Sequence, residues 1–193
     1  MSNINFSYHI FQRNNQKYDV CGDSCFIGNN DTCAICVVAD GLGSGPNAHD
    51  SAQIVASIVE QYCEMPLDQL MLKCNEALKS KRGAVASIIR CHFDRGEMQY
   101  CGVGNISCYL MHDGEIRYPR PHYGYLAGKQ IAPFVEVFAI QPGDKCMMHS
   151  DGIEMNDLSL LTKESTWQAL ICNEADDLLT YKNDDQTYAI MQF

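Results

Sequence analysis

Aspartates stand at several points where the sequence passes between an apolar run and a turn. The members of this set are Asp23, Asp40, Asp151, Asp184 and Asp185. Asp40 is followed by glycines at 41, 43 and 45, which allow the backbone to approach a ligand closely. Carboxylates gathered at strand ends repel one another unless cations neutralise them, and oxygen ligands suit hard ions such as Mg²⁺ or Mn²⁺. The set therefore predicts a site for divalent cations.

Each aspartate also has an ordinary structural explanation. Asp151 precedes a glycine in a common turn pair, and the pair that begins at Asp184 can cap a helix or remain solvated. The glycine loop 41–45 lacks the Gly-Lys-Ser/Thr ending of a P-loop and the third glycine of a dinucleotide fingerprint. Ser44 is not centred in a nucleophile elbow. The metal site is favoured by the whole set, not by one position.

Thiol chemistry receives less support from the sequence. The eleven cysteines are spread along the chain, and in a reducing compartment they are expected to be small buried residues, not a disulfide framework. Cys33 and Cys36 form a Cys-x-x-Cys pair, but no second pair follows at the spacing of a zinc site. Cys21 and Cys25 have no evident activating histidine for a nucleophilic role.

Length, composition and charge limit the class of protein. With 193 residues, 46% of them hydrophobic, the chain is expected to form one domain over residues 1–193. The net charge of -10 argues against a nucleic-acid partner. The start of the chain lacks the pattern of a signal peptide, and no apolar run approaches the ~20 residues that span a bilayer. These features predict a soluble, cytoplasmic protein that does not bind membranes.

The hydrophobic spacing predicts many strands and few helices. Alternation of apolar residues predicts a first strand over residues 4–10, and the Asp-Gly pair at 113–114 predicts a hairpin turn. Further strands are predicted at 21–27, 33–39, 84–93, 98–103, 106–112, 115–118, 134–140, 145–150 and 187–193.

The helices are predicted in three places. The period changes to that of a helix after Pro46, and a second helix runs from Pro66 to a basic end near residue 82. A helical region is predicted over 158–179, with a break near Asn173. This order of elements is typical of an α+β domain with helices packed on antiparallel sheets.

Six short motifs, taken in order, resemble those of the metal-dependent serine/threonine protein phosphatases of type 2C. They are Gly22-Asp23-Ser24, Ala39-Asp40-Gly41-Leu-Gly-Ser-Gly45, Gly83-Ala-Val-Ala-Ser87, Gly102-Val-Gly-Asn105, Ser150-Asp151-Gly152 and Asp184-Asp-Gln-Thr187. The resemblance covers nearly the whole chain. The short length and the stretches 79–87 and 124–129 look closest to the RsbX-type branch, which resets the bacterial stressosome as negative feedback on the general stress response.

The resemblance implies a fold and a site. The fold would be a four-layer αββα sandwich, with two antiparallel sheets flanked by helices and no flap subdomain. The site would hold two Mn²⁺ or Mg²⁺ ions, with Asp40 bridging them, the Gly41 carbonyl as a further ligand, and Asp151 and Asp184 each binding one ion. Asp23 would act through a metal-bound water. Catalysis would then proceed through a metal-activated water, without a covalent nucleophile on the protein.

One position departs from the family pattern. The family often places an arginine before the first motif to hold the phosphate, whereas this chain has Lys17 in the preceding segment. Lys17 is a candidate for binding substrate as a point charge, and a solvated loop residue is the other interpretation. The motifs at 83–87 and 102–105 are expected to be packing and turn elements, not catalytic ones.

The sequence thus predicts a protein phosphatase whose partners are phosphorylated stressosome scaffold or antagonist proteins. Two alternatives remain open. The substrate could be a phosphorylated anti-anti-sigma factor, or the chain could be a catalytically silent pseudophosphatase that only binds a partner. The presence of Asp40, Asp151 and Asp184 argues against the silent alternative.

Overall fold

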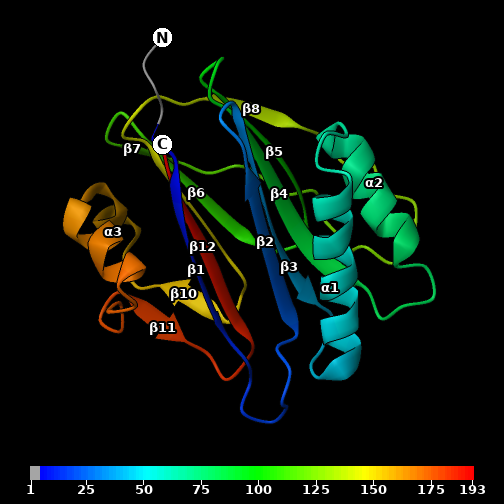
Figure 1. Ribbon diagram of the computed structural model, residues 1–193. Coiled ribbons are helices and arrows are strands. Elements are labelled where there is room, and N and C mark those ends of the chain that lie inside the picture. Colours follow the sequence, from blue (N-terminus) through cyan, green and yellow to red (C-terminus); the bar gives the residue numbers. More distant parts are fainter. Residues whose placement is uncertain (1–4) are drawn as a thin grey trace.

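The structure is a computed structural model that describes residues 5–193 of the chain. Two antiparallel five-stranded sheets face each other, and helices cover both outer faces (Figure 1). The strands of the first sheet, in spatial order, are β2 (Asp23–Asn29), β3 (Cys33–Gly41), β4 (Ala84–His92), β5 (Glu97–Val103) and β8 (Glu136–Ala139). Those of the second sheet are β1 (Ser7–Arg13), β12 (Gln186–Gln192), β9 (Lys145–His149), β6 (Ser107–His112) and β7 (Glu115–Arg117). The expected sandwich of two antiparallel sheets flanked by helices is confirmed.

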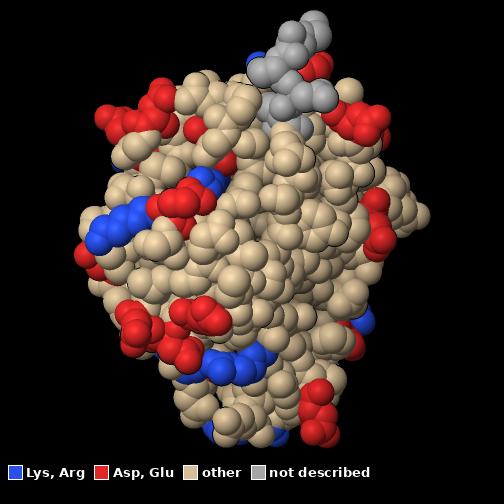
Figure 2. All heavy atoms as spheres, turned by 60° about the vertical axis from the view of Figure 1, so that its left-hand side comes forward, with Lys and Arg blue, Asp and Glu red and all other residues tan. Residues whose placement is uncertain are grey.

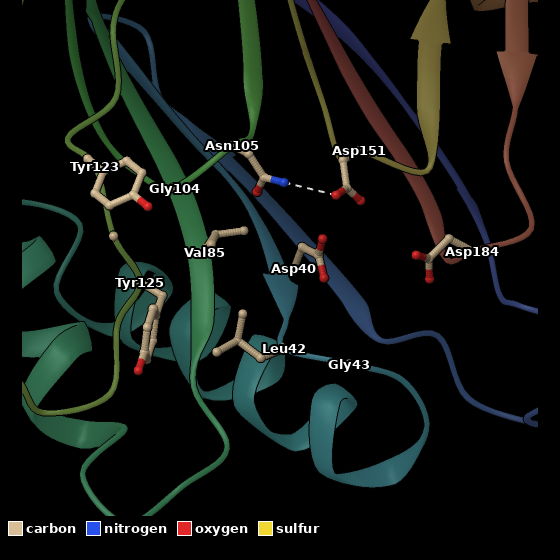
Figure 3. Close-up of a pocket in the computed structure, with 11 residues that line it drawn as sticks. Asp40, Leu42, Gly43, Val85, Gly104, Asn105, Tyr123, Tyr125, Asp151 and Asp184 are labelled. Atoms are coloured by element: carbon tan, nitrogen blue, oxygen red, sulfur yellow. Dashed lines mark hydrogen bonds between the residues drawn. The ribbon is translucent and has the colours of Figure 1, made fainter.

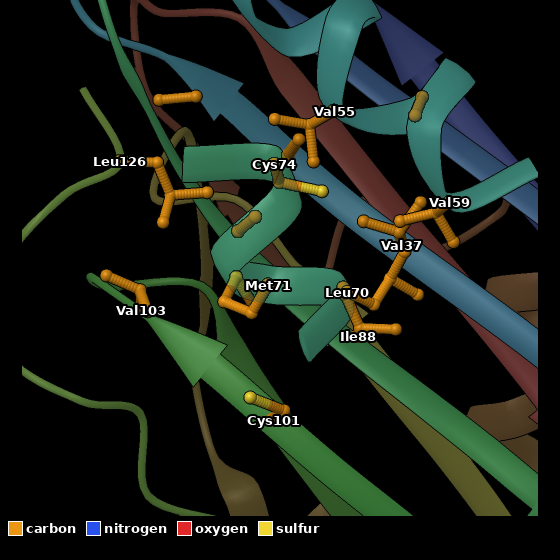
Figure 4. Packing of buried hydrophobic residues seen from close by; sticks show 14 of the residues in the cluster. Val37, Val55, Val59, Leu70, Met71, Cys74, Ile88, Cys101, Val103 and Leu126 are labelled. Atoms are coloured by element: carbon orange, nitrogen blue, oxygen red, sulfur yellow. The ribbon is translucent and has the colours of Figure 1, made fainter. Parts of the chain in front are cut away.

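Helices α1 (Pro46–Gln61) and α2 (Leu67–Ala77) cover the first sheet, as the helical spacing predicted. Pro46 occupies the first turn of α1, where its missing N–H costs nothing. The apolar face of α2 is fully buried, and Figure 4 shows Leu70, Met71 and Cys74 close to side chains of the first sheet. The prediction for α2 was too long at its end, because the helix stops at Ala77.

The second sheet is covered by a 3₁₀ turn (Leu158–Thr162) and α3 (Glu164–Ile171). The prediction of one helical region over 158–179 was therefore wrong after Ile171. Asn173 takes a left-handed backbone angle, φ 57°, that ends the helix at the predicted break. The chain then enters β11 (Leu179–Tyr181), which pairs with β10 (Ile153–Met155). Strands of three residues are too short to reveal a two-residue period in the sequence.

The remaining strands lie close to their predicted positions, with one informative shift. The first strand runs over Ser7–Arg13, and Ile4 of the predicted strand lies outside the described residues. Tyr8 and Ile10 keep 51% and 36% of their surface exposed, whereas Phe11 stacks on Tyr188 at 4.8 Å between ring centroids. Tyr8 and Ile10 are exposed because β1 is the edge strand of its sheet, where apolar residues are only partly covered.

The predicted hairpin is confirmed, whereas the prediction of buried cysteines holds for six of the eleven; four others are half-buried and Cys172 is exposed. All eleven cysteines lie within the described residues and are free. Cys33 and Cys36 are both on β3, where residues three apart point to opposite faces of the sheet, so the pair cannot hold one metal ion. Asp113 and Gly114 have φ angles of 51° and 76°, as a tight hairpin turn requires. Among helices within residues 5–193, none has the length and apolar character needed to cross a membrane.

Candidate active site

A pocket of about 560 Å³ opens at one end of the sandwich, where several strands terminate. Figure 3 shows the carboxylates of Asp40, Asp151 and Asp184 facing a common space in this pocket. The remaining lining residues are Leu42, Gly43, Val85, Gly104, Asn105, Tyr123, Gly124 and Tyr125. None of the described residues that line the pocket is a lysine or arginine, and the ion pairs of the described residues include none of its three carboxylates.

Asp40 enters the pocket from the end of β3, beside Asp23 of the neighbouring strand. The two residues are register partners across the β2–β3 pair. Behind them the backbone of Gly41 passes so close to α1 that a Cβ would lie 1.9 Å from the carbonyl oxygen of Ala48. Gly41 itself is buried and donates its N–H to the carbonyl of Gly22 at 3.1 Å. The strand end is therefore held rigidly against both the next strand and the helix.

Asp23 lies just behind the pocket and joins the two sheets. Its Oδ2 accepts a hydrogen bond of 2.6 Å from the hydroxyl of Ser150, which follows β9 of the other sheet. The same hydroxyl accepts the backbone N–H of Thr187 at 3.0 Å. Among the described residues, Asp23 Oδ1 is one of the few buried side-chain atoms without a hydrogen-bond partner. A buried carboxylate oxygen left open in this way is suited to a water or cation.

The electrostatics of the acidic group favour protons or cations. Burial, reinforced by Asp23 and Asp151, raises the pKa of Asp40 to about 9. Burial also raises the pKa of Asp23 to about 7, although hydrogen bonds from Ser150 and Thr187 oppose the shift. The surrounding carboxylates make Asp40 and Asp23 harder to ionise, because like charges at short range in a protein interior are costly. A divalent cation would remove this cost.

The two aspartates before β12 have different surroundings. Asp184 is exposed and lines the pocket. Asp185 is buried, and its Oδ1 accepts the backbone N–H of Asn15 at 2.8 Å, which fixes the turn after β1. The structure therefore brings the first member of the pair into the pocket and gives the second a structural bond.

Asn105 is a site residue that the sequence reasoning missed. It was expected to be a turn element, but it lines the pocket and its Nδ2 donates to Asp151 Oδ2 at 2.9 Å (Figure 3). Val85 and Gly104 of the motifs expected only to pack also line the pocket. The signal that could have found Asn105 is the one used for the aspartates, a polar residue directly after a strand.

Lys17 is not brought into this pocket. It is exposed in the turn after β1, where its backbone N–H donates to Asn15 Oδ1 at 3.2 Å. Arg13, at the end of β1, instead lines a second pocket that shares Asp184 with the first. The sequence reasoning also missed Tyr123 and Tyr125, which lie in a segment without regular secondary structure and form one wall of the pocket (Figure 3).

The donor set suits a hard divalent ion. All three pocket carboxylates supply oxygen, and the open Asp23 oxygen lies behind them. Within residues 5–193, no three His, Cys, Asp or Glu side chains are grouped closely enough to act as the ligands of one ion. Water and backbone oxygens would complete the coordination, as is usual for Mg²⁺, which keeps several waters when bound to one or two carboxylates.

Known proteins resemble this chain in sequence and in fold. Residues 30–181 match the family described as Stage II sporulation protein E (SpoIIE). The phosphoserine phosphatase RsbX of Bacillus subtilis is 36% identical over 185 residues, which are 95% of this chain and 92% of that protein. A crystal structure of RsbX in complex with magnesium superimposes with a TM-score of 0.88 at 35% identity, over 97% of this chain and 94% of the other.

A further solved structure, reported under the heading "The bacterial stressosome: a modular system that has been adapted to control secondary messenger signaling", has a TM-score of 0.86 at 27% identity. The match covers 97% of this chain and 99% of that one.

This chain is a protein phosphatase of the PP2C type. Its two antiparallel sheets face each other, are covered by helices and carry aspartates at their strand ends. Within that class, the chain belongs to the SpoIIE family.

Proposed function

We propose that this protein is a divalent-metal-dependent phosphatase that removes the phosphoryl group from phosphoserine or phosphothreonine of stressosome proteins in the cytoplasm. By doing so it would return the stressosome to its resting state, as negative feedback on the general stress response. The observation that carries the proposal is the set of three carboxylates, Asp40, Asp151 and Asp184, around one pocket that contains no protein cation. The likeness to RsbX over most of both chains supports the choice of partner.

In this proposal, Asp40, Asp151 and Asp184 hold two Mg²⁺ or Mn²⁺ ions, together with the carbonyl of Gly41 and, through water, Asp23. Such a pair of ions lowers the pKa of a shared water and neutralises the oxygens of the phosphoryl group. The protein supplies position and charge, and no side chain forms a covalent intermediate. Bound cations also reverse the local field, so an acidic protein can accept a dianionic substrate.

Neighbouring residues keep the carboxylates in place. Asn105 donates to one oxygen of Asp151 and leaves the other free to bind. Ser150 fixes the carboxylate of Asp23 and, because it follows a strand of the second sheet, ties that sheet to the first. Both contacts orient acidic groups without adding positive charge that would compete with the ions.

The experiment measures hydrolysis of p-nitrophenyl phosphate with Mn²⁺ or Mg²⁺ and after removal of metal with EDTA. The wild type should be active only with metal, and Asp40→Asn should lose activity while keeping its circular dichroism spectrum and thermal transition. Asp31→Asn is the matched control, because Asp31 is exposed in the turn at the opposite end of the β2–β3 pair. Comparable activity in Asp40→Asn would refute the mechanism.

A second experiment tests the substrate. The enzyme is incubated with a phosphorylated stressosome scaffold protein and, separately, with a phosphorylated anti-anti-sigma factor, and phosphate release is measured. Faster release from the scaffold protein supports the proposal. Faster release from the anti-anti-sigma factor would make that protein the substrate instead. Failure of the wild type to bind Mn²⁺ in a calorimetric titration would favour the silent alternative.

A further inference from the structure

The reaction pocket has a polar neighbour, which we call the side pocket. It has a volume of about 660 Å³ and shares the wall formed by Asp184 with the reaction pocket. Its basic members are Arg13, from the end of β1, and Lys182, from the segment before β12. The rest of its wall consists largely of amide side chains, which include Asn14, Gln16 and Asn183. The side pocket is thus chemically opposite to the reaction pocket, which contains carboxylates.

The guanidinium of Arg13 is held in position before any ligand arrives. Its Nε donates to Oε1 of Gln186 at 2.7 Å. Its carbon Cζ lies 4.6 Å from the ring centre of Tyr181 and 5.7 Å from that of Phe11. In the hydrogen-bond network of the described residues only Nε of Arg13 is engaged, so the paired N–H groups of the fork remain to bind a carboxylate.

Lys182 is fixed through its backbone while its side chain stays adaptable. Its backbone N–H donates to the carbonyl of Gly152 at 2.9 Å, which places it next to the loop that carries Asp151. Its ammonium lies 3.8 Å from Glu154, in an exposed pair that contributes little and can exchange partners. The side pocket therefore offers two cations from different segments of the chain.

Two cations in one pocket are unusual on this protein. The chain has 14 basic residues against 24 acidic ones. On the face shown in Figure 2, acidic side chains form several clusters, whereas Lys and Arg occur in short separate groups. The acidic residues of a polypeptide are repelled by these clusters, so a basic pocket next to the reaction centre can determine how the polypeptide is oriented.

From this geometry we propose that the side pocket binds an acidic side chain of the substrate, located a few residues from the phosphorylated serine or threonine. The inference rests on the proposed phosphatase function and adds a specificity determinant to it. Arg13 and Lys182 recognise the flanking carboxylate and do not contact the phosphoryl group. Because the side pocket lies only on the Asp184 side of the reaction pocket, the preference is confined to one side of the phosphorylated residue.

The experiment uses phosphoserine peptides in which one Glu is moved through the four positions on each side, with Gln at the same position as the reference. For the wild type, Glu on one side should raise kcat/KM over Gln by about threefold to fivefold, the range expected of an exposed ion pair. This ratio should fall toward one in Arg13→Gln and in Lys182→Gln, and also in the wild type at 1 M salt. Arg95→Gln, an exposed arginine in the β4–β5 turn far from the site, should keep the wild-type ratio.

Hydrolysis of p-nitrophenyl phosphate separates the possible outcomes, because this substrate has a phosphoryl group and no flanking residue. Its kcat/KM should be unchanged in both side-pocket variants. A loss there as large as the loss with Glu peptides would show that Arg13 contacts the phosphoryl group, and would overturn the inference. Equal rates with Glu and Gln at every position would also overturn it and leave the proposed function intact. Absence of metal-dependent hydrolysis by the wild type would refute the proposed function instead.

Discussion

Asn75 is the residue whose substitution tests most directly how the wall of the pocket is held. It is a buried residue of α2, with 6% of its surface exposed. Its Nδ2 donates to the carbonyl of Lys129 at 2.7 Å, and its Oδ1 accepts the N–H groups of Ala127 and Gly128, both at 3.0 Å. This side chain therefore ties the end of the segment that carries Tyr123 and Tyr125 to α2, in addition to the backbone bonds between Leu126 and Ala84.

The expected cost follows from counting these bonds. Each contributes about 0.5–1.5 kcal/mol, and a buried partner left without a bond costs about 1–3 kcal/mol. Asn75→Ala removes three bonds but gains up to about 0.7 kcal/mol in helix propensity, so we expect a net loss of about 1–4 kcal/mol. Asn75→Asp keeps the acceptor for two N–H groups, but its second carboxylate oxygen faces the carbonyl of Lys129 in a buried site, so its loss should be at least as large as that of Asn75→Ala.

The assay is urea unfolding followed by circular dichroism, with kcat/KM for a phosphopeptide measured in parallel. Gln69→Ala, an exposed position on the same helix, is the control and should change the free energy of unfolding by less than about 0.5 kcal/mol. The Ala variant should also lose more activity toward the peptide than toward p-nitrophenyl phosphate, because the loosened segment forms one wall of the pocket. A loss below about 0.5 kcal/mol in Asn75→Ala, or an Asp variant as stable as the wild type, would refute this account of the anchor.

Two further predictions concern the acidic end of the sandwich. Without metal, the pKa is raised to about 9 for Asp40 and about 7 for Asp23. Between the ordinary aspartate pKa near 4 and these values, the folded protein keeps protons that the unfolded chain has released. The free energy of unfolding therefore falls as pH rises from about 4 to about 9. Mn²⁺ replaces these protons, so the rise in Tm on adding Mn²⁺ should be larger at pH 8 than at pH 6, and the reverse order in a thermal-shift assay would contradict the assignment. Gly41→Ala should lower the free energy of unfolding by more than about 2 kcal/mol and reduce activity, because its Cβ would meet the carbonyl of Ala48 at 1.9 Å; wild-type stability in urea would show that the helix can move aside.

The sequence was a good guide to elements with a clear period and a poor one to short or irregular segments. The Leu67 to Cys74 face of α2 repeats every three or four residues, and all of its apolar members are buried as predicted. The β10–β11 ribbon has three residues per strand and was not predicted; only Leu179 of it lay within the predicted helical region. In such short strands, pairing with a distant partner decides the structure, and that pairing leaves no local signal.

The same difference explains which site residues were found. Aspartates such as Asp40 follow long apolar strands, so their place at a strand end could be inferred from the sequence. Arg13 reaches the site area through the register of an edge strand, and Tyr123 through a segment fixed by backbone bonds, such as those of His122 to Gly102 and Gly104. Neither arrangement can be read from the neighbouring sequence.

The position of the site between the two sheets explains why small cysteine side chains lie in the layer that separates the sheets. Asp40 belongs to the first sheet and Asp151 follows a strand of the second, so the separation of the sheets sets the separation of their carboxylates. The layer between the sheets contains four buried cysteines, Cys36, Cys91, Cys108 and Cys146. The Sγ atoms of Cys108 and Cys146 are 3.8 Å apart across neighbouring strands. Small polarisable side chains fill this layer closely, and larger ones would push the sheets apart and the carboxylates with them.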